Sequence, residues 1–263
     1  MSAIELIAQI RSGIAQIALE KDRQVLGNGS AFRVHGGLVT NSHVIRPPGI
    51  IDAIIIRFEN TEQQIRLLPD RFYNATLAES QESDKDYAFI NLEEPEFVGR
   101  HEFEFGDLSD VSVGEKILFL GFPFGMPQLT AHMGYISSIH EQQGKTIIQI
   151  DGSVNGGNSG GPLICLESGK VVGIITRAIT GIIEQEFNNL IATLQNNQRL
   201  LAQSRATISV GGVDPIQGLR ASQAAMEQIA RNLKRSANVG IGYAFSTNYI
   251  RDHIQNLNLA TSC

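Results

Sequence analysis

The chain has 263 residues, of which 42% are hydrophobic and 18% charged, and its formal net charge is −6. These fractions are typical of a globular protein, and the length is enough to bury a full core in one structural unit. The negative charge argues against general binding to nucleic acid, and two cysteines are too few for a disulfide framework.

The N-terminal stretch predicts neither a secretion signal nor a membrane span. Polar residues such as Glu5 and Arg11 interrupt its apolar residues, so the continuous apolar core of a signal peptide is missing. No run along the chain is apolar and long enough to suggest a transmembrane helix. With only Cys165 and Cys263 as thiols, we expect an intracellular, cytoplasmic protein with reduced cysteines and no membrane partner.

The first half of the chain has the pattern of a β-barrel. Isoleucines recur at helical spacing from Ile4 to Ile17, which predicts a short amphipathic helix or a helix that leads into a strand. From Val25 to Leu92, runs rich in Ile, Val and Phe alternate with turn residues, as in Ile50–Phe58 and Tyr73–Leu77. We expect these runs to be the strands of a first barrel.

A second set of strands follows, after a connection over residues 93–115. The same strand pattern returns between Lys116 and Ile175. The expected strands of this second barrel are 117–120, 134–139, 146–150, 163–165 and 171–175.

The pattern then changes to that of helices. Apolar residues take helical spacing over Glu184–Gln203 and again over Gln217–Arg235. These two helices interrupt the second barrel, because a further strand is expected at Gly240–Phe245. Asn248–Leu257 predicts a C-terminal helix, with a possible cap at the preceding residues.

The glycine-rich segment Gly156–Leu163 carries the strongest chemical signal, because it places Ser159 among backbone N–H groups that a substrate carbonyl can approach. A serine is a weak nucleophile without a base and a group that orients the base. His43 is the candidate base, and Asp86, which opens an apolar strand, is the candidate orienting acid. Asp84 is a rival for this last role, and we favour Asp86 because the apolar run that anchors it follows directly.

Five sequence blocks support one family resemblance. They are GSAF at 29–32 with TNSH at 40–43, DYAF at 86–89, GFPFG at 121–125, GNSGGP at 157–162 and VGIGYAFS at 239–246. In this order and spacing the chain resembles the chymotrypsin-fold, trypsin-like serine peptidases, and within them the HtrA or DegP-like branch. The resemblance covers roughly residues 25–255, apart from the helical interruption, and no segment resembling a PDZ domain follows.

The resemblance implies an all-β core of two six-stranded antiparallel barrels of the chymotrypsin type. The whole chain, 1–263, is then a single protease domain. Its expected parts are a first barrel at about 22–95, a second at 112–182 and 238–247, a helical-hairpin insertion at 183–237 and a C-terminal helix at 248–258. In such a fold the histidine and aspartate of the first barrel meet the serine of the second in the cleft between them.

The resemblance also assigns roles. It makes His43, Asp86 and Ser159 a catalytic triad and the N–H groups of Gly157 and Ser159 an oxyanion hole. Asn158 stands where digestive relatives have the aspartate that binds a new N-terminus, so activation by N-terminal cleavage is not expected.

The substrate pocket is assigned by its position relative to the nucleophile. The pocket floor falls at Ser153, six residues before Ser159, and the expected pocket wall leads into Thr176 and Arg177. The expected pocket floor has no acidic group that would bind a Lys or Arg side chain of the substrate. We therefore expect a small or medium apolar side chain before the scissile bond. An inward Arg177 would favour an acidic residue instead.

The expected function is an intracellular serine endopeptidase that cleaves protein or peptide substrates without a cofactor or metal. One alternative is a non-catalytic protein that keeps the fold as an interaction module. A second is an α/β-hydrolase-type esterase, because Gly157-x-Ser159-x-Gly161 matches a nucleophile elbow with Asp214 and His253 downstream. An elbow requires a helix after the serine, whereas a strand-like run follows here.

The helical insertion has two interpretations. Its apolar faces either pack only on each other and on the barrel, or the hairpin at 183–236 gates the pocket or binds a regulatory protein. An intracellular protease without a cleavage switch needs some such restraint.

Overall fold

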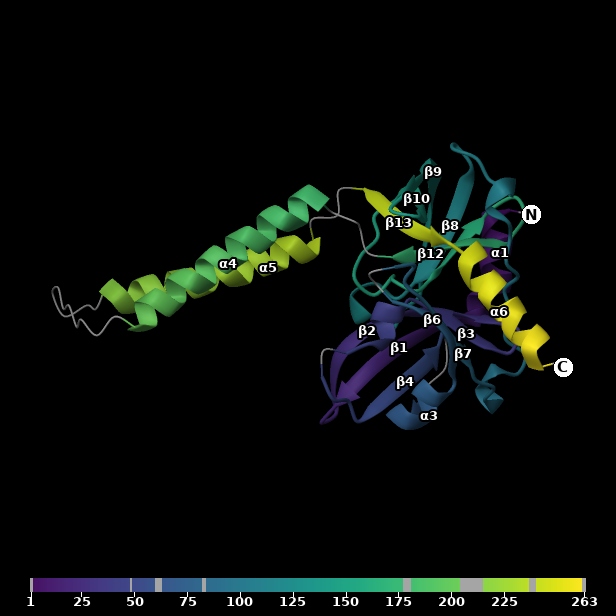
Figure 1. Cartoon of the computed structure of the whole chain (residues 1–263), viewed down its shortest axis with the longest axis horizontal. Helices are drawn as coiled ribbons and strands as arrows, with labels where there is room; N and C mark the ends of the chain where they lie inside the picture. The colour runs from purple at the N-terminus through teal and green to yellow at the C-terminus, as the bar shows by residue number, and fades with distance from the viewer. Residues whose placement is uncertain are drawn as a thin grey trace. The chain divides into compact units, whose positions relative to one another are not determined.

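The computed structural model describes residues 2–47, 49–59, 63–81, 84–176, 181–203, 215–236 and 240–261. The chain divides into two compact units (Figure 1). Unit 1 comprises residues 1–178 and 240–263, and unit 2 comprises residues 179–239.

The N-terminal lobe of unit 1 is a seven-stranded antiparallel sheet in the order β5-β4-β1-β2-β3-β7-β6. Its strands are β1 (Ile14–Lys21), β2 (Gln24–Val34), β3 (Gly37–Thr40), β4 (Ala53–Phe58), β5 (Ile65–Leu67), β6 (Thr76–Ser80) and β7 (Tyr87–Asn91). A long hairpin of β1 and β2 forms the middle of the sheet, with Ile14 opposite Phe32.

The C-terminal lobe is a closed six-stranded barrel in the order β10-β13-β12-β11-β8-β9. Its strands are β8 (Lys116–Gly121), β9 (Thr130–Gln142), β10 (Lys145–Asp151), β11 (Pro162–Cys165), β12 (Val171–Thr176) and β13 (Ile241–Ser246). The barrel closes because β13, which follows the insertion in the chain, pairs with both β10 and β12.

The predicted fold class is confirmed, with differences in its first lobe. The sheet has seven strands rather than the six of a closed barrel. It also begins at Ile14 and not near residue 22, because the residues from Ile14 to Leu19 are almost all buried and pair on both sides, with β2 and with β4. The N-terminal helix-to-strand transition is present, since α1 (Ala3–Ile10) and a 3-10 turn (Arg11–Gly13) lead directly into β1.

One predicted strand is partly helical. Tyr73 and Asn74 belong to α3 (Pro69–Asn74), and β6 begins only at Thr76. Pro69 at the first helical position, with Asp70 in the first turn, favours a helix start that the apolar pattern alone does not reveal.

The two lobes share a continuous apolar core, which fixes the space between them. Phe32 of β2 and Val39 of β3 belong to the same buried cluster as Leu120 of β8 and Ile174 of β12. The cluster packs strands of one lobe against strands of the other, so side chains from both lobes can lie within hydrogen-bonding distance.

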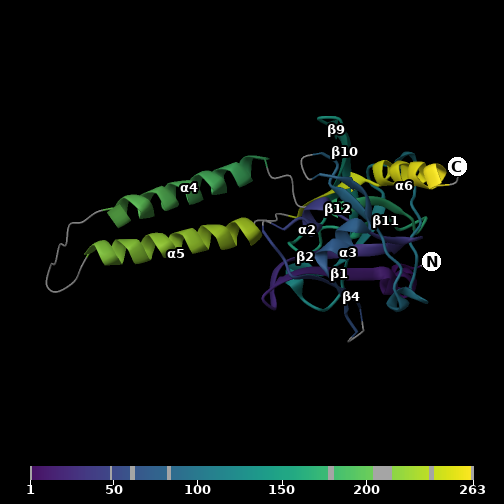
Figure 2. The ribbon, with the colours of Figure 1, turned by 60° about the horizontal axis from the view of Figure 1, so that its bottom comes forward.

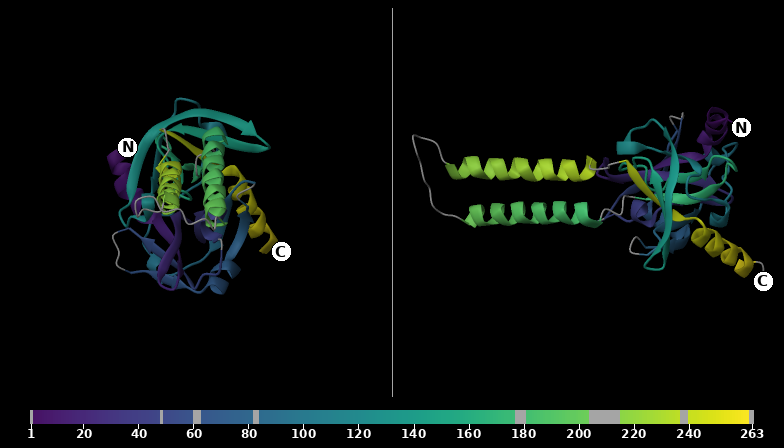
Figure 3. Two further views of the ribbon diagram at one scale, coloured as in Figure 1. Left: turned by 90° about the vertical axis from the view of Figure 1, so that its left-hand side faces the viewer. Right: turned by 90° about the horizontal axis from the view of Figure 1, so that it is seen from above.

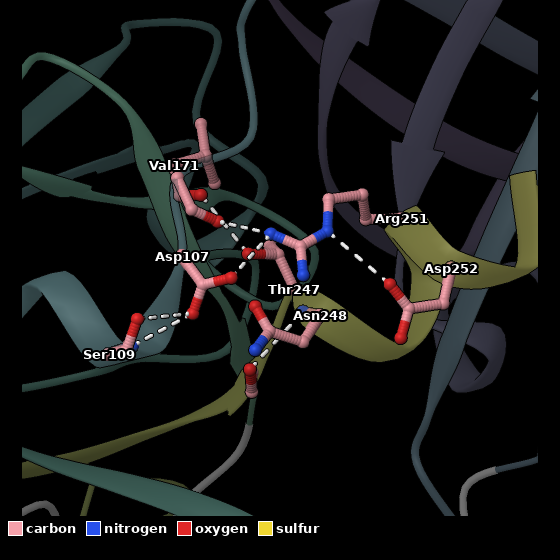
Figure 4. A network of polar contacts seen from close by, with 9 residues as sticks. Asp107, Ser109, Val171, Thr247, Asn248, Arg251 and Asp252 are labelled. Carbon is pink, nitrogen blue, oxygen red and sulfur yellow. Dashed lines mark hydrogen bonds and ion pairs between the residues drawn. The ribbon is translucent and has the colours of Figure 1, made fainter. Parts of the chain in front are cut away.

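Helix α6 (Asn248–Thr261) is fixed to the barrel at its first turn (Figure 4). The Thr247 hydroxyl donates to the carbonyl of Val171 at 3.1 Å, and the Arg251 guanidinium contacts the Asp107 carboxylate at 3.0 Å. Two hydrogen bonds from Ser109, with the bond from Arg251, lower the pKa of Asp107 to about 2. The start of α6 is therefore attached to the barrel by the Thr247–Val171 hydrogen bond and the Asp107–Arg251 ion pair, which we call the α6 anchor.

Unit 2 is an antiparallel helical hairpin of α4 (Gly181–Gln203) and α5 (Pro215–Ser236) (Figures 2 and 3). Their bounds lie within three residues of the predicted ones. The buried apolar residues described between the helices are Ile191, Leu194 and Ala230.

Candidate active site

His43 lies on a one-turn helix, α2 (Ser42–Ile45), that follows β3 directly. Its side chain is 8% exposed. The ring Nδ1 lies 2.7 Å from Oδ2 of Asp86, and the backbone N–H of His43 donates to Oδ1 at 3.1 Å. One carboxylate thus holds both the ring and the backbone of the histidine.

Asp86 is 1% exposed, and three further contacts hold it in place. The hydroxyl of Thr176 donates to Oδ2 at 3.1 Å, and the Asn41 side-chain amide donates to the Asp86 carbonyl at 2.7 Å. The backbone N–H of Asp86 donates to the carbonyl of Gln81 at 3.1 Å. Asp86 adopts φ 47°, a left-handed conformation that a non-glycine residue keeps only where the surrounding structure enforces it.

The rival acid does not approach the histidine. Asp84 accepts a hydrogen bond from Ser80 at 2.8 Å in an exposed position. The structure therefore brings together His43 and Asp86 from the first lobe with Thr176 from the second.

Ser159 is 3% exposed and lies on the loop between β10 and β11. Ser30 of β2 binds this loop at two points. Its N–H donates to the Ser159 carbonyl at 2.8 Å, and its hydroxyl donates to the Gly157 carbonyl at 2.7 Å. The same hydroxyl accepts from the Phe122 N–H at 3.0 Å. Ser30 was not predicted as a site residue, although it lies in the GSAF block that supported the resemblance.

Two glycines of the loop are required by space as well as by conformation. Gly157 has φ 99°, and a Cβ there would lie 2.2 Å from the Phe122 carbonyl oxygen. Gly160 has φ 87°, and a Cβ there would lie 2.1 Å from the Ser30 carbonyl oxygen. Any other residue would strain the backbone at both positions.

The loop leaves two backbone donors free beside the serine. Within the described residues, the N–H groups of Gly157 and Ser159 donate to no acceptor, whereas Asn158 between them donates to Asn155. The Gly156 carbonyl accepts from the Phe124 N–H, and in a trans peptide the Gly157 N–H points the opposite way. Two unpaired donors separated by one residue form an arrangement that can bind an oxyanion.

Ser159 and His43 are not yet hydrogen-bonded to each other. Within the described residues, the Ser159 hydroxyl has no hydrogen bond to the His43 ring. Such bonds are often long without substrate and shorten when it binds.

The predicted pocket residues have different surroundings. Ser153 is partly exposed in the segment before Val154, whereas Thr176 is 4% exposed with its hydroxyl on Asp86. Arg177 lies outside the described residues, as does Asp214 of the esterase alternative.

The local structure around Ser159 disfavours the esterase alternative. The strand β11 follows the serine, whereas a nucleophile elbow requires a helix there. His253, the other residue of that alternative, lies with Nδ1 3.0 Å from the Tyr87 hydroxyl.

The described residues contain no group of three or more His, Cys, Asp or Glu side chains that could hold a metal ion. In the same part of the chain no helix is both long and apolar enough to cross a membrane.

The model of the trypsin-like peptidase domain matches residues 27–174, a range that contains His43, Asp86 and Ser159. The chain belongs to the trypsin-like peptidase family. Among curated relatives, it is 35% identical over 166 residues to a probable periplasmic serine endoprotease, DegP-like, of Rickettsia conorii, covering 57% of this chain and 28% of the relative. A DegP-like relative of Chlamydia pneumoniae is 30% identical over 162 residues, covering 60% and 30%. The chain thus spans less than a third of either relative.

The solved structures support the same fold. The HtrA-type protease AlgW with a tripeptide superposes with a TM-score of 0.60 at 20% identity, covering 98% of this chain and 64% of AlgW. The trypsin-like fold is therefore confirmed, and the similarity to the DegP-like relatives confirms the resemblance to the HtrA branch.

The expected cytoplasmic location is wrong, because the DegP-like relatives of Rickettsia conorii and Chlamydia pneumoniae are named periplasmic endoproteases. The expectation depended on few cysteines and on the polar residues near residue 5. A chain that buries a core of this size needs no disulfides in an oxidising compartment, so its cysteine count does not fix the location.

Proposed function

We propose that this trypsin-like peptidase is a serine endopeptidase that cleaves protein or peptide substrates through an acyl-enzyme. The observation that carries the proposal is the buried contact of His43 Nδ1 with Asp86 at 2.7 Å, in a molecule whose Ser159 loop is held by Ser30. AlgW was solved with peptides, which supports a peptide substrate here. We also propose a periplasmic location, as named for the relatives.

The triad roles follow from the hydrogen bonds. With Nδ1–H donated to Asp86, Nε2 of His43 is the ring atom that can accept the Ser159 proton. Ser159 Oγ then attacks the scissile carbonyl, and the protonated ring gives its proton to the leaving amine. Asp86 keeps its hydrogen bond to Nδ1–H and stabilises the imidazolium, with Thr176 as an additional donor to its Oδ2.

The free N–H groups of Gly157 and Ser159 are the proposed oxyanion hole. They are fixed before charge develops on the substrate oxygen, so their stabilisation requires no rearrangement in the transition state. Removing one such donor in other enzymes costs about 3–4 kcal/mol.

The proposed substrate preference is a small or medium apolar side chain before the scissile bond. Ser153 offers no acidic group to a Lys or Arg side chain. Thr176 lies at the end of the strand proposed to line the pocket, although its own hydroxyl is bound to Asp86.

Control of the peptidase by the hairpin remains part of the proposal. Unit 2 follows β12, whose last residue donates to the catalytic carboxylate. Replacing residues 183–236 with a short Gly-Ser linker is expected to leave unit 1 folded and to change peptide turnover. Unchanged turnover and unchanged partner binding in a folded variant would remove this part of the proposal.

A fluorophosphonate probe tests the catalytic proposal. We expect labelling of Ser159 in the native chain, almost none in His43→Ala or Ser159→Ala, and normal labelling in Ser168→Ala, an exposed serine control. For peptide hydrolysis, the double variant His43→Ala/Ser159→Ala should be little worse than either single variant, because the two residues act as one unit. Absence of labelling in the native chain would favour the non-catalytic interaction module instead.

A further inference from the structure

Helix α5 presents a polar side to its partner helix. Gln195 and Gln198 of α4 donate to the Glu227 carboxylate at 3.0 and 2.9 Å. On the same side of α5, Ala230 is 2% exposed against Ile191 and Leu194. Over the described residues, the side of α5 that is covered within the hairpin therefore has two apolar residues, the buried Ala230 and the half-buried Ile216, beside the polar Gln223 and Glu227.

Three large apolar side chains among the described residues of α5 lie on another side and are open to solvent. Leu219 is 47% exposed, Met226 53% and Ile229 56%. With 100° of rotation per residue, they fall on one face together with three smaller exposed positions, and this face covers roughly a third of the helix circumference. We call it the α5 apolar stripe; it consists of Gly218, Leu219, Ser222, Ala225, Met226 and Ile229.

No charged residue interrupts this stripe. The described charged side chains of α5 are Arg220, Glu227 and Arg231, and the rotation per residue places all three roughly opposite the middle of the stripe, about 140–180° away. Arg220 donates to the Leu201 carbonyl, and Arg231 pairs with Glu227. Their charges are thus used inside the hairpin, and nothing on the stripe repels an identical stripe.

The described part of the hairpin's core contains few fully buried residues. Three buried apolar residues are described between helices of 23 and 22 residues. Helices in water depend on packing of an apolar face for most of their stability. Within the described residues of α5, the α5 apolar stripe is the uncovered apolar surface that can bury further area against another surface.

We propose that the α5 apolar stripe pairs with the same stripe of a second copy of this chain, in antiparallel orientation. The stripe positions 219, 222, 226 and 229 are spaced three, four and three residues apart, so a two-fold axis beside residue 224 superposes the set on itself. In that register Leu219 meets Ile229 of the second copy and Met226 meets Ser222, a large residue against a small one. Antiparallel helices also place their dipoles favourably.

The size of the contact fits a reversible dimer. The stripe extends from residue 218 to residue 229, about 17 Å along the helix, so a contact confined to it buries less than the roughly 1,200–2,000 Å² of stable protein interfaces. A contact of this size is typical of a weak, transient interface. The pairing uses no residue of the active site and is independent of the proposed peptidase activity.

Sedimentation equilibrium of the full chain tests the pairing, in the Ser159→Ala background so that self-cleavage cannot shorten the protein. We expect a monomer–dimer equilibrium in the micromolar range. Met226→Glu should weaken dimerisation at least about a hundredfold, because it buries a charge at the contact. Ala224→Glu is the matched control: it adds the same charge at an exposed position on the opposite side of α5 and should leave the dimer within about threefold.

The same measurements can overturn the proposal. If the parent chain stays monomeric at several hundred micromolar, the stripe has another occupant. Slow hydrogen exchange over 219–229 in that monomer would identify the chain's own unit 1, and fast exchange would indicate a different protein. If Met226→Glu loses helical circular dichroism, Leu219→Ala/Ile229→Ala removes apolar area with a strong helix former and should still weaken the dimer at least tenfold. Equal dimerisation in that variant would also overturn the proposal.

Discussion

The two units differ in how completely their polar groups find hydrogen-bond partners and their apolar side chains are buried. Around Asp86, the carboxylate, the carbonyl and the N–H all have partners within unit 1, and the apolar residues of β12 are all buried. In α5 the side chains of Leu219, Met226 and Ile229 are about half exposed, while the Glu227 carboxylate lies on the covered side. The described polar groups around Asp86 thus find their partners within unit 1, whereas the exposed face of α5 is the one that we propose a second copy covers.

The active-site loop should be the region least tolerant of change. Gly160→Ala places a Cβ against the Ser30 carbonyl and forces φ 87° on alanine. We expect a loss of more than about 3 kcal/mol in unfolding free energy and at least a hundredfold in kcat/KM. The control is Gly156→Ala in the same loop, where a Cβ meets nothing within 4 Å. Similar losses in both variants would show that the loop is sensitive to any side chain.

A matched pair of isoleucines measures the contrast between the units directly. Ile174→Ala removes a side chain that is 1% exposed in the shared core and should cost about 2–5 kcal/mol. Ile229→Ala removes one that is 56% exposed and should cost under about 0.5 kcal/mol in the monomer at high dilution. Denaturant unfolding at low protein concentration gives both values. A large cost at Ile229 under those conditions would mean that the stripe is covered within the single chain.

The Thr176 hydroxyl should contribute a smaller, separable effect. Thr176→Val keeps the shape but removes the donor to Asp86, with an expected cost of about 1–2 kcal/mol and a roughly tenfold fall in kcat. Thr176→Ser keeps the hydroxyl and should recover most of the activity. If valine and serine variants hydrolyse peptide equally fast, the hydroxyl does not position Asp86.

The weakest expected effect is the acid dependence of the α6 anchor. Asp107 has its pKa lowered from 3.8 to about 2, so its contribution to stability is complete above pH 3.8 and is lost as the pH falls toward 2. The stability difference between the native chain and Asp107→Asn should therefore shrink over that interval. Thermal unfolding at a series of pH values measures it, and a constant difference would argue against the Asp107–Arg251 contact in solution.

Several features could be predicted from the sequence because they depend on local pattern. The GNSGGP block identified the Ser159 loop, and the apolar run after Asp86 distinguished it from Asp84, which the structure leaves at the surface. The helices α4 and α5 were evident from the spacing of their apolar residues.

Other features depend on contacts between distant residues. Ser30 binds a loop 127 residues away, and no local pattern predicts that partner. Thr176 was predicted as a pocket residue, and its contact with Asp86 requires the two lobes to be assembled first. The exposure of the α5 apolar stripe was also unexpected, because periodicity shows that a face is apolar but not what covers it.

The pairing of β12 with β13 has a consequence for how such a chain can acquire new parts. Thr176, where β12 ends, lies opposite Tyr243, near the start of β13. The chain therefore leaves the barrel and returns to it at neighbouring strand ends, as it would through a tight turn. A helical hairpin also begins and ends at one place, so it can replace that turn without shifting the register of any strand. The connection between β12 and β13 is therefore a site that tolerates insertions. Helical hairpins of other lengths or sequences can be placed there while the barrel stays closed.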